Sequence, residues 1–365
     1  MRNFNKFILN IDNLECNVSL IKRLLKDNVK LCAVVKADAY GMNVDTVVPI
    51  LDKYVDMFAV SNVFEAKQIR ELGIGTDILV LGEVGIENIN YCVKHNITIS
   101  VGNFDYIKAI YPKLHSSIKV HLKINTGLNR YGIKTKSELK KCLDYIKNHH
   151  KIVLDGVFTH FATKREDIDF LNTQKCIFDD FCTLVPKCVT KHCANSFATI
   201  FSSSLQYDMV RIGINMYGDL RDDKLPLKDV LRIESEIVAI NIVKKYQSIG
   251  YDRTFVADRI MKVAVVPLGY ADGISRKASN KFYVIVNDKP AKIVGNVCMD
   301  SFMIDITDIP YTYIGSQVII VGDYVGGKIS IGDWARATKT SPYDILLKFR
   351  YRRCEYIAMS TKNKN

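Results

Sequence analysis

The 365-residue sequence lacks any long uncharged apolar run, and its ten cysteines include no C-x-x-C pair. Without such a run no segment is typical of a membrane-spanning helix, and residues 1–9 alternate polar and apolar side chains too often for a secretory signal. Several cysteines, such as Cys32, lie inside apolar runs, which fits neither a zinc site nor a disulfide framework. We therefore expect a soluble, cytoplasmic protein with no metal site and no membrane partner.

A concentrated basic stripe is also missing, although the formal net charge is +12. Lysine and arginine residues are interspersed along the whole chain, and no nucleic-acid-binding motif accompanies them. The positive surplus is best explained as a solvated basic surface, with attraction to anionic metabolites left open. We expect no nucleic-acid partner.

Short apolar or β-rich runs are present throughout the first part of the chain. Segments with helical patterning separate them, such as residues 63–73, which end on a glycine. The runs number about eight, which is the count that a (β/α)8 barrel requires. They lie at residues 31–35, 57–60, 78–81, 97–101, 119–124, 154–159, 188–193 and 209–212.

From about Arg232 the pattern changes to alternating strands and tight turns. Residues 283–295 are typical of a β-hairpin around Asn287 and Asp288, and residues 318–322 of another strand. One helical segment is expected near residues 334–350. The sequence thus predicts an α/β protein with an N-terminal (β/α)8 TIM-type barrel over residues 1–231 and a mainly β domain over residues 232–365.

Chemistry in such a barrel is found at the C-terminal ends of its strands, where this sequence carries polar and small residues. They are Lys36 and Tyr40 after the first strand, Arg130 after the fifth, His160 after the sixth, Asn195 and Ser196 after the seventh, and Arg211, Gly213 and Ile214 at the eighth. An amine, an imidazole, an arginine and small donors that suit a phosphate together match the requirements of pyridoxal phosphate.

Each of these residues alone also fits an ordinary structural role. A strand-end histidine such as His160 is more often a hydrogen-bonded structural residue, and Asn195 with Ser196 would serve equally well as a helix N-cap. Arg211 could pair with a structural carboxylate, and Lys36 could leave the core for solvent. Their joint position at successive strand ends favours the cofactor site.

Six motifs, in this order along nearly the full length, resemble those of the alanine racemases, fold-type III enzymes that use pyridoxal phosphate. The motifs are A-V-V-K-A-D-A-Y-G at residues 33–41, T-H-F-A-T at 159–163, H-C-A-N-S at 192–196, V-R-I-G-I-N-M-Y-G at 210–218, G-Y-A-D-G at 269–273 and C-M-D at 298–300. The resemblance implies a set of cofactor contacts. Lys36 would carry pyridoxal 5'-phosphate covalently and Arg211 would face its ring nitrogen. The other contacts would come from Tyr40, Ser196, Gly213 and Ile214 at the phosphate, and from His160 and Asn195 beside them.

The resemblance also implies a second half of the site. Tyr251 corresponds to a second catalytic base, and Arg130 with the backbone of Met299 would meet the substrate carboxylate. Tyr270 and Asp300 would line the entrance. Family members form homodimers in which the β domain of one subunit completes the barrel mouth of the other, so we expect shared active sites and a small amino-acid substrate.

Two opposed bases suit a racemisation, because a proton must leave one face of the substrate Cα and another must arrive on the opposite face. Lysine and tyrosine side chains ordinarily have pKa values of about 10, so their surroundings must lower them. We predict an isomerase that interconverts L-alanine and D-alanine with Lys36 and Tyr251, supplying D-alanine for peptidoglycan. The alternatives are a racemase of serine or another amino acid, a fold-type III amino-acid decarboxylase, and a non-catalytic carrier of pyridoxal phosphate.

Three positions depart from, or add to, the family pattern. Asn129 replaces a common glycine before Arg130, and it can adopt a left-handed backbone. Lys123 matches a lysine that is often carbamylated, and we expect the same here because a bare ammonium would repel Arg130. Phe349 aligns with a tyrosine that contacts the phosphate in some relatives, which leaves substrate choice open between alanine and larger amino acids.

Overall fold

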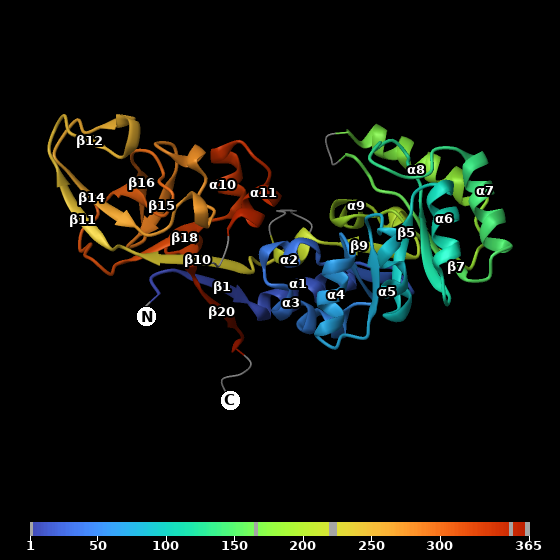
Figure 1. The fold of residues 1–365 in the computed structure, drawn as a ribbon. Coiled ribbons are helices and arrows are strands. Elements are labelled where there is room, and N and C mark those ends of the chain that lie inside the picture. Colours follow the sequence, from blue (N-terminus) through green and yellow to red (C-terminus); the bar gives the residue numbers. More distant parts are fainter. Residues whose placement is uncertain (1–2, 164–166, 219–224, 350–352, 362–365) are drawn as a thin grey trace.

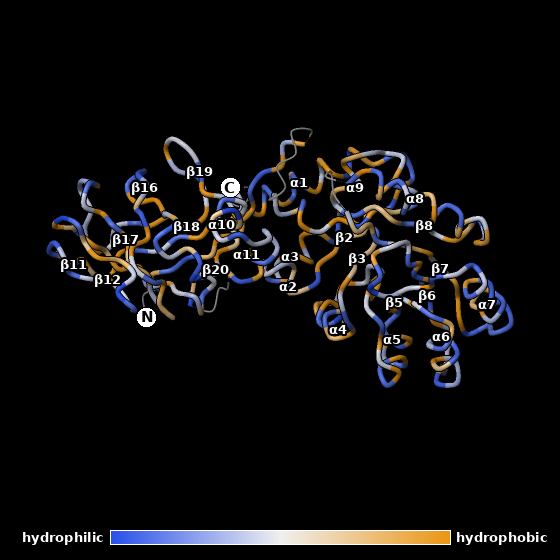
Figure 2. The backbone as a smooth tube through the Cα atoms, turned by 90° about the horizontal axis from the view of Figure 1, so that it is seen from above, coloured by the Kyte–Doolittle hydropathy of each residue, from blue (hydrophilic) through white to orange (hydrophobic). Residues whose placement is uncertain are grey.

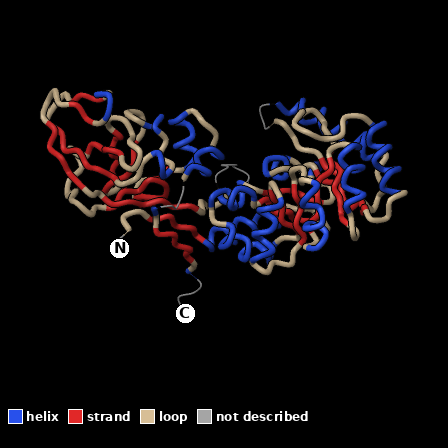
Figure 3. Tube along the Cα trace, viewed as in Figure 1, coloured by secondary structure: helices blue, strands red, loops and turns tan. Residues whose placement is uncertain are grey.

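The computed structural model describes residues 3–163, 167–218, 225–349 and 353–361 and contains a barrel and a β-rich domain side by side (Figure 1). Helices and strands alternate in the barrel, whereas strands dominate the other domain (Figure 3). The predicted fold class is therefore confirmed. Among the described residues, no helix combines the length and the apolar character that crossing a bilayer would require.

Eight parallel strands form the barrel, in the spatial order β8-β7-β6-β5-β4-β3-β2-β9. The ring closes through two backbone hydrogen bonds, from Asp208 N–H to the Lys191 carbonyl and from Arg211 N–H to the Ala194 carbonyl, both at 3.0 Å. The strands are β2 (Lys30–Val34), β3 (Met57–Val60), β4 (Asp77–Val80), β5 (Ile97–Val101), β6 (Ile118–Lys123), β7 (Ile152–Phe158), β8 (Thr190–His192) and β9 (Met209–Ile212). All eight strands overlap the predicted runs.

Helices surround these strands, and most of them begin at a side-chain cap. Asn10 accepts from Asn13 N–H at 2.9 Å at the start of the first helix, and Thr135 accepts from Glu138 N–H at 3.1 Å. Figure 2 shows hydrophilic and hydrophobic stretches alternating along α4 to α7, as expected for amphipathic helices. The barrel helices are α1 (Ile11–Arg23), α2 (Lys36–Gly41), α3 (Val44–Leu51), α4 (Val63–Glu71), α5 (Ile89–Lys94), α6 (Phe104–Ile110), α7 (Lys136–Lys147), α8 (Ile168–Cys182) and α9 (Ser196–Phe201).

The second domain is built on a ten-stranded sheet with the order β11-β14-β17-β16-β15-β18-β10-β1-β20 and with β19 paired to β18. Its strands are β1 (Lys6–Asn10), β10 (Leu231–Glu236), β11 (Ala239–Val243), β14 (Met261–Val266), β15 (Tyr283–Val286), β16 (Lys289–Ile293), β17 (Phe302–Asp305), β18 (Gln317–Tyr324), β19 (Gly327–Ile329) and β20 (Glu355–Met359). A separate hairpin comprises β12 (Ser248–Ile249) and β13 (Phe255–Val256). The predicted hairpin at 283–295 is present, and its turn residues Asn287 and Asp288 have φ of 47° and 59°.

The N-terminal strand β1 does not belong to the barrel. It pairs antiparallel with β10 and parallel with β20, so both ends of the chain lie in the second sheet. The domain boundary at residue 231 stays a prediction. Lys6–Asn10 precede that boundary in sequence but pair with strands of the second sheet rather than with the barrel. Two helices, α10 (Ile331–Thr338) and α11 (Pro342–Lys348), occupy the predicted helical segment. Helix α11 packs closely against α2, as shown by Gly41, where a Cβ would lie 3.3 Å from the Leu346 carbonyl oxygen.

Candidate functional site

A cavity of about 700 Å³ opens at the C-terminal ends of the barrel strands. Nine of the residues singled out from the sequence line it: Lys36, Tyr40, Lys123, Arg130, His160, Asn195, Ser196, Arg211 and Gly213. Ile214 is fully buried directly behind Gly213. Four of the nine are lysine or arginine, and none of the described residues that line the cavity is acidic. The cavity is therefore suited to anionic groups.

The segment that carries Lys36 and Tyr40 is a left-handed turn. Residues Ala37, Asp38, Ala39 and Tyr40 have φ between 52° and 60°, a conformation that costs L residues roughly 1–2 kcal/mol each. Asp38 Oδ1 accepts from Val44 N–H at 2.7 Å, and Glu65 Oε1 accepts from Ala37 N–H at 2.9 Å. These carboxylates hold the turn so that Lys36 and Tyr40 both reach the cavity. Burial and the nearby Arg130 lower the pKa of Lys36.

Small donors gather where a phosphate would fit. Ser196 Oγ accepts from Gly213 N–H at 3.0 Å, and a Cβ at Gly213 would lie 2.2 Å from the Tyr40 hydroxyl. Only glycine therefore leaves room for the tyrosine here. The side chain of Asn195 is the N-cap of α9 and accepts from Ala198 N–H at 3.0 Å. Asn195 thus fits the N-cap alternative, whereas the Ser196 hydroxyl lies with Gly213 and Tyr40 where a phosphate would fit.

Arg211 is 3% exposed and has only neutral partners among the described residues. Nη1 contacts His192 Nδ1 at 2.7 Å and the His192 carbonyl at 3.2 Å, and Nη2 donates to the carbonyls of Thr159 at 2.8 Å and Cys193 at 3.1 Å. Nε makes no hydrogen bond to a described residue, although the side chain lines the cavity. The expected alternative of a directly paired carboxylate is therefore absent from the described part of the chain, and Nε can donate to a ligand atom.

A chain of buried imidazoles links Arg211 to the outside of the barrel. His192 Nε2 lies 2.8 Å from His121 Nδ1, and His121 Nε2 lies 3.2 Å from Asp155 Oδ2. Arginine can only donate, so His192 must accept through Nδ1 and carry its proton on Nε2. The same logic makes His121 accept through Nδ1 and donate through Nε2. Burial lowers the pKa of both histidines, so a neutral pair with fixed tautomers joins a guanidinium to a carboxylate.

His160 lies beside Arg211, with Nδ1 at 3.4 Å from Nη2. Burial, and then the charge of Arg211, lower the pKa of His160 to about 3. The imidazole is therefore neutral at physiological pH, which suits packing against a cofactor ring.

Lys123 ends β6 inside the barrel and is 3% exposed. Its Nζ lies 3.3 Å from the centre of the Tyr131 ring, and it has no ion pair with any residue that the structure describes. Burial, and then Arg130, lower the pKa of Lys123 to about 7. Asn129, before Arg130, has φ of 55°, as its replacement of a glycine predicts.

The predicted residues of the β domain do not reach this cavity within one chain. Tyr251 follows β12, at the end of that domain far from the barrel (Figure 1). It is 69% exposed, and Met299 and Tyr270 are 60% and 46% exposed. The last two belong to adjoining loops, because Tyr270 N–H donates to the Cys298 carbonyl at 3.0 Å. Asp300 is also exposed beside them.

The alignment of Phe349 with a phosphate-contacting tyrosine is wrong. Phe349 is 2% exposed and packs against Trp334, with ring centres 5.9 Å apart. Tyr343, at the start of α11, lines the cavity instead, and its ring centre lies 6.1 Å from that of Tyr40. The tyrosine is six positions earlier, at the start of α11, and the sequence pattern alone did not reveal which of the two aromatic side chains faces the cavity.

Other site residues also escaped the sequence-based prediction. Asp155, His121 and Tyr131 were not singled out, and His192 was recognised only as part of a motif. One signal was available: His121 and Lys123 are polar residues two apart in a barrel strand, a spacing that directs both side chains to the same face. A second signal was Gly156, since a glycine inside a strand often marks a close approach of another group. In the structure a Cβ at this position would lie 2.6 Å from the His121 ring.

Comparisons with known proteins cover almost the whole chain. The family model described as "Alanine racemase, N-terminal domain" matches residues 9–221, and "Alanine racemase, C-terminal domain" matches residues 230–356. Alanine racemase 2 of Caldanaerobacter subterraneus subsp. tengcongensis is 35% identical over 350 residues, which cover 92% of this chain and 90% of that protein.

Solved structures give the same result. The alanine racemase of Bacillus anthracis, solved with bound L-Ala-P, superposes with a TM-score of 0.91 at 29% identity, covering 99% of this chain and 96% of that one. The alanine racemase of Bartonella henselae, solved with covalently bound pyridoxal phosphate, shares the fold with a TM-score of 0.88 at 23% identity and covers 98% and 100% of the two chains.

Proposed function

Since this chain belongs to the alanine racemase family of isomerases, we propose that it interconverts L-alanine and D-alanine with pyridoxal 5'-phosphate, using Lys36 and Tyr251 as opposed bases. The observation that carries the proposal is the cavity itself, where four basic side chains, Lys36 among them, meet small phosphate donors, and where no described lining residue is acidic. We also propose that the D-alanine supplies peptidoglycan, as the resemblance implies.

The cavity residues fit pyridoxal phosphate. The phosphate would lie among the Tyr40 hydroxyl, Ser196 Oγ and the backbone at Gly213, where a Cβ would collide. Arg211 Nε would donate to the ring nitrogen, and neutral His160 would pack beside the ring. Lys36 would carry the cofactor covalently. When bound, the cofactor draws electrons from the Cα of an attached amino acid and so acidifies its Cα–H bond.

Two features of the protein direct this chemistry toward racemisation. Arg211 keeps its proton, because guanidinium cannot realistically give it up, so it would offer the ring nitrogen a hydrogen bond, and no carboxylate of a described residue lines the cavity beside it. A decarboxylase of the same layout would use a carboxylate there. Lys36, whose pKa burial and Arg130 lower, can accept the Cα proton on its own face.

Tyr251 would serve the other face from a second copy of the chain. In a homodimer, the exposed loops that carry Tyr251, Tyr270, Met299 and Asp300 would cover the barrel mouth of the partner. Arg130 at the cavity rim and the Met299 backbone would hold the substrate carboxylate. The exposure of these loops and their distance from the Lys36 cavity within one chain support this arrangement.

The substrate proposal favours alanine over larger amino acids. The sequence-based doubt depended on Phe349 replacing a tyrosine at the phosphate, but Tyr343 supplies a phenol beside Tyr40. A carrier protein without catalysis is disfavoured because the chain has a complete β domain. An amino-acid panel assayed for enantiomer interconversion tests the choice, and faster turnover of serine than of alanine would contradict it.

Mixing two inactive variants tests the shared site. In a dimer of Lys36→Ala and Tyr251→Phe chains, one mouth would lack both bases and the other would have both. Random reassortment in a two-fold dimer should therefore restore about a quarter of wild-type activity. No restoration, with mixed dimers verified by a tag on each chain, would show that the two residues do not act across the interface. Lys36→Ala alone should also lose the visible absorbance of the bound cofactor.

A further inference from the structure

The loop that carries Tyr251 has a strained backbone on a small support. Gly250, Asp252 and Arg253 have φ of 74°, 61° and 51°, so two non-glycine residues stand in the left-handed region that L side chains rarely adopt. The flanking strands β12 and β13 are two residues long. The apolar cluster beneath comprises Ile249, Ala257, Met261, Val263 and Val294. Polar contacts must therefore hold the shape of the loop.

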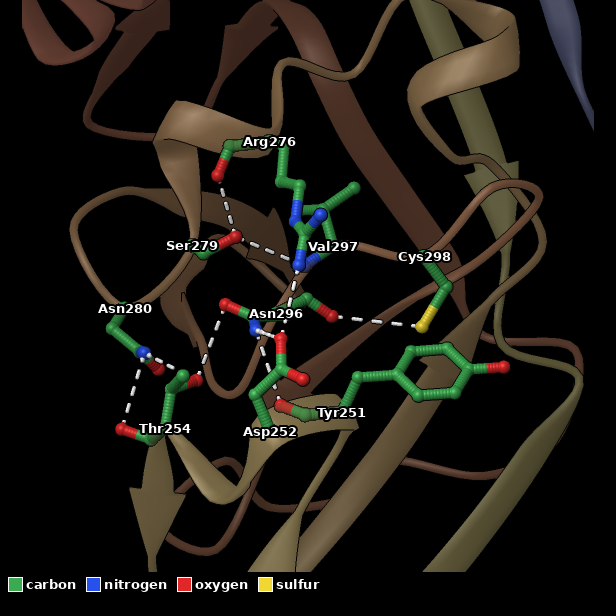
Figure 4. Close-up of polar contacts among 9 residues, drawn as sticks. All are labelled: Tyr251, Asp252, Thr254, Arg276, Ser279, Asn280, Asn296, Val297 and Cys298. Atoms are coloured by element: carbon green, nitrogen blue, oxygen red, sulfur yellow. Dashed lines mark hydrogen bonds and ion pairs between the residues drawn. The ribbon is translucent and has the colours of Figure 1, made fainter.

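Asn296 supplies those contacts from a neighbouring loop (Figure 4). Its Nδ2 donates to the backbone carbonyl of Tyr251 at 3.1 Å and to Asp252 Oδ2 at 3.0 Å. Its Oδ1 accepts from the Thr254 hydroxyl at 3.2 Å. One amide thus contacts residues on both sides of the strained Arg253.

The loop of Asn296 is itself fixed to a third loop. Gly295 N–H donates to Asn280 Oδ1 at 2.7 Å, and Val297 N–H donates to Ser279 Oγ at 2.9 Å. Asn280 Nδ2 also reaches the Thr254 hydroxyl at 3.2 Å. Figure 4 shows Ser279, Asn280 and Thr254 around Asn296, with the ring of Tyr251 pointing away from them. The third loop therefore holds the backbone on both sides of Asn296 and also contacts the loop of Tyr251 through Thr254.

An ion pair contributes less than this amide. Arg276 Nη2 lies 3.1 Å from Asp252 Oδ2, but the two side chains are 59% and 66% exposed. Solvent and salt screen such pairs strongly. Asn296 makes three directed hydrogen bonds, one of them to the backbone carbonyl of Tyr251 itself, whereas the ion pair reaches only the side chain of Asp252.

We propose that Asn296 is a positioning residue that aims Tyr251 at the substrate Cα in the partner's barrel mouth. The inference rests on the proposed function, because it requires Tyr251 to act as a base. Asn296 lies three residues before Met299, so the same contacts also fix Tyr251 relative to the backbone that would meet the substrate carboxylate. Small errors in such an arrangement reduce rate steeply, by about 100-fold for a displacement of about 1 Å.

The test is the exchange of the Cα–H of each alanine enantiomer with deuterium from solvent, catalysed by cofactor-loaded dimers. Asn296→Asp keeps the size and the Oδ1 acceptor, removes both Nδ2 donors and adds a carboxylate beside Asp252. Exchange should fall about 10- to 100-fold for the enantiomer that Tyr251→Phe suppresses, and much less for the other. Thr254→Val removes the hydroxyl that donates to Asn296 Oδ1. It should slow exchange of the same enantiomer, but by a smaller factor than Asn296→Asp.

Asn287→Ala is the matched control. Asn287 also holds a loop through its amide, with Nδ2 at 3.1 Å from the Pro310 carbonyl and 3.2 Å from the Tyr311 carbonyl. Its loss should lower the melting temperature and leave the enantiomer ratio unchanged. Equal loss from both enantiomers, or an unchanged ratio, in Asn296→Asp and Thr254→Val would overturn the proposal. If Tyr251→Phe itself shows no asymmetry, the base assignment fails instead.

Discussion

Replacing Asp155 tests the directed chain of hydrogen bonds from Arg211 through two histidines. Asp155→Ala removes the acceptor of His121 Nε2–H, which lies 3.2 Å from Oδ2. A hydrogen bond to a charged group contributes about 1.5–3 kcal/mol when buried, but Asp155 is 34% exposed, so water can replace part of it. We expect Asp155→Ala to lower the free energy of unfolding by about 1–2 kcal/mol. Asp155→Asn, whose Oδ1 can still accept, should lose less than about 1 kcal/mol.

The pH dependence of this loss has a defined sign. The hydrogen bond from His121 lowers the pKa of Asp155 below its ordinary value. A carboxyl whose pKa is lower in the folded state stabilises the fold above its unfolded pKa, and that stabilisation disappears as the pH falls through the folded pKa. The difference in unfolding free energy between wild type and Asp155→Asn should therefore shrink in acid. Urea titrations at several pH values measure it.

Nuclear magnetic resonance of ¹⁵N-labelled histidine provides the decisive readout. Because guanidinium can only donate, both His192 and His121 should carry their proton on Nε2 and none on Nδ1. In Asp155→Ala the signal of His121 should shift most and that of His192 less. A proton on Nδ1 of either ring, or an unfolding free energy equal to that of wild type for Asp155→Ala, would refute the directed chain.

Three further predictions concern the cavity. Ala37→Gly should raise the unfolding free energy by about 0.5–1 kcal/mol in thermal or urea unfolding, because relief of the left-handed strain exceeds the entropy cost of glycine at this exposed site; a loss of stability would contradict the strain argument. Gly213→Ala should weaken cofactor binding at least about 10-fold in absorbance titrations, because its Cβ would lie 2.2 Å from the Tyr40 hydroxyl; unchanged affinity would move the phosphate elsewhere. Burial lowers the pKa of Lys123 to about 7, so a neutral amine is available to react with CO₂. Incubation with ¹³C-bicarbonate should therefore give a carbamate NMR signal in wild type but not in Lys123→Ala. No carbamate signal in the wild-type protein would show that Lys123 is unmodified.

The order of strands and the cavity wall could be predicted because both follow from local patterns. Parallel barrel strands are buried on both faces and are recognisable as short apolar runs, as β2 and β3 show. Residues at the C-terminal ends of such runs lie at one end of the barrel, so the sequence alone is enough to group Lys36, Ser196 and Arg211. The motif resemblance added Tyr251, which no pattern of strands would have singled out.

Other features depend on contacts distant in sequence and could not be predicted. The left-handed turn after Lys36 relies on Glu65, whose carboxylate comes from the next strand–helix unit. Strand β1 carries no mark that it pairs with β10 and β20, since pairing partners are set by the folded chain. The expectation for Phe349 failed for a similar reason, because the sequence alone does not show which aromatic side chain near α11 faces the barrel until that helix is placed against α2.

The positive charge of the cavity links binding to the reactivity of Lys36. Lys36, Lys123, Arg130 and Arg211 meet there with no acidic lining residue among those described. Arg130 disfavours protonation of both lysines, and Arg211 and Lys36 add to the effect at Lys123. The Arg130 charge that would attract the substrate carboxylate therefore also helps to keep Lys36 ready to accept a proton. Bound anions would raise its pKa again, so the spacing between Lys36 and the anion sites must be a compromise between holding the substrate and keeping the amine basic but unprotonated. A further carboxylate among the lining residues would disturb both properties at once, because it would compete with bound anions for the cations and would raise the pKa of both lysines.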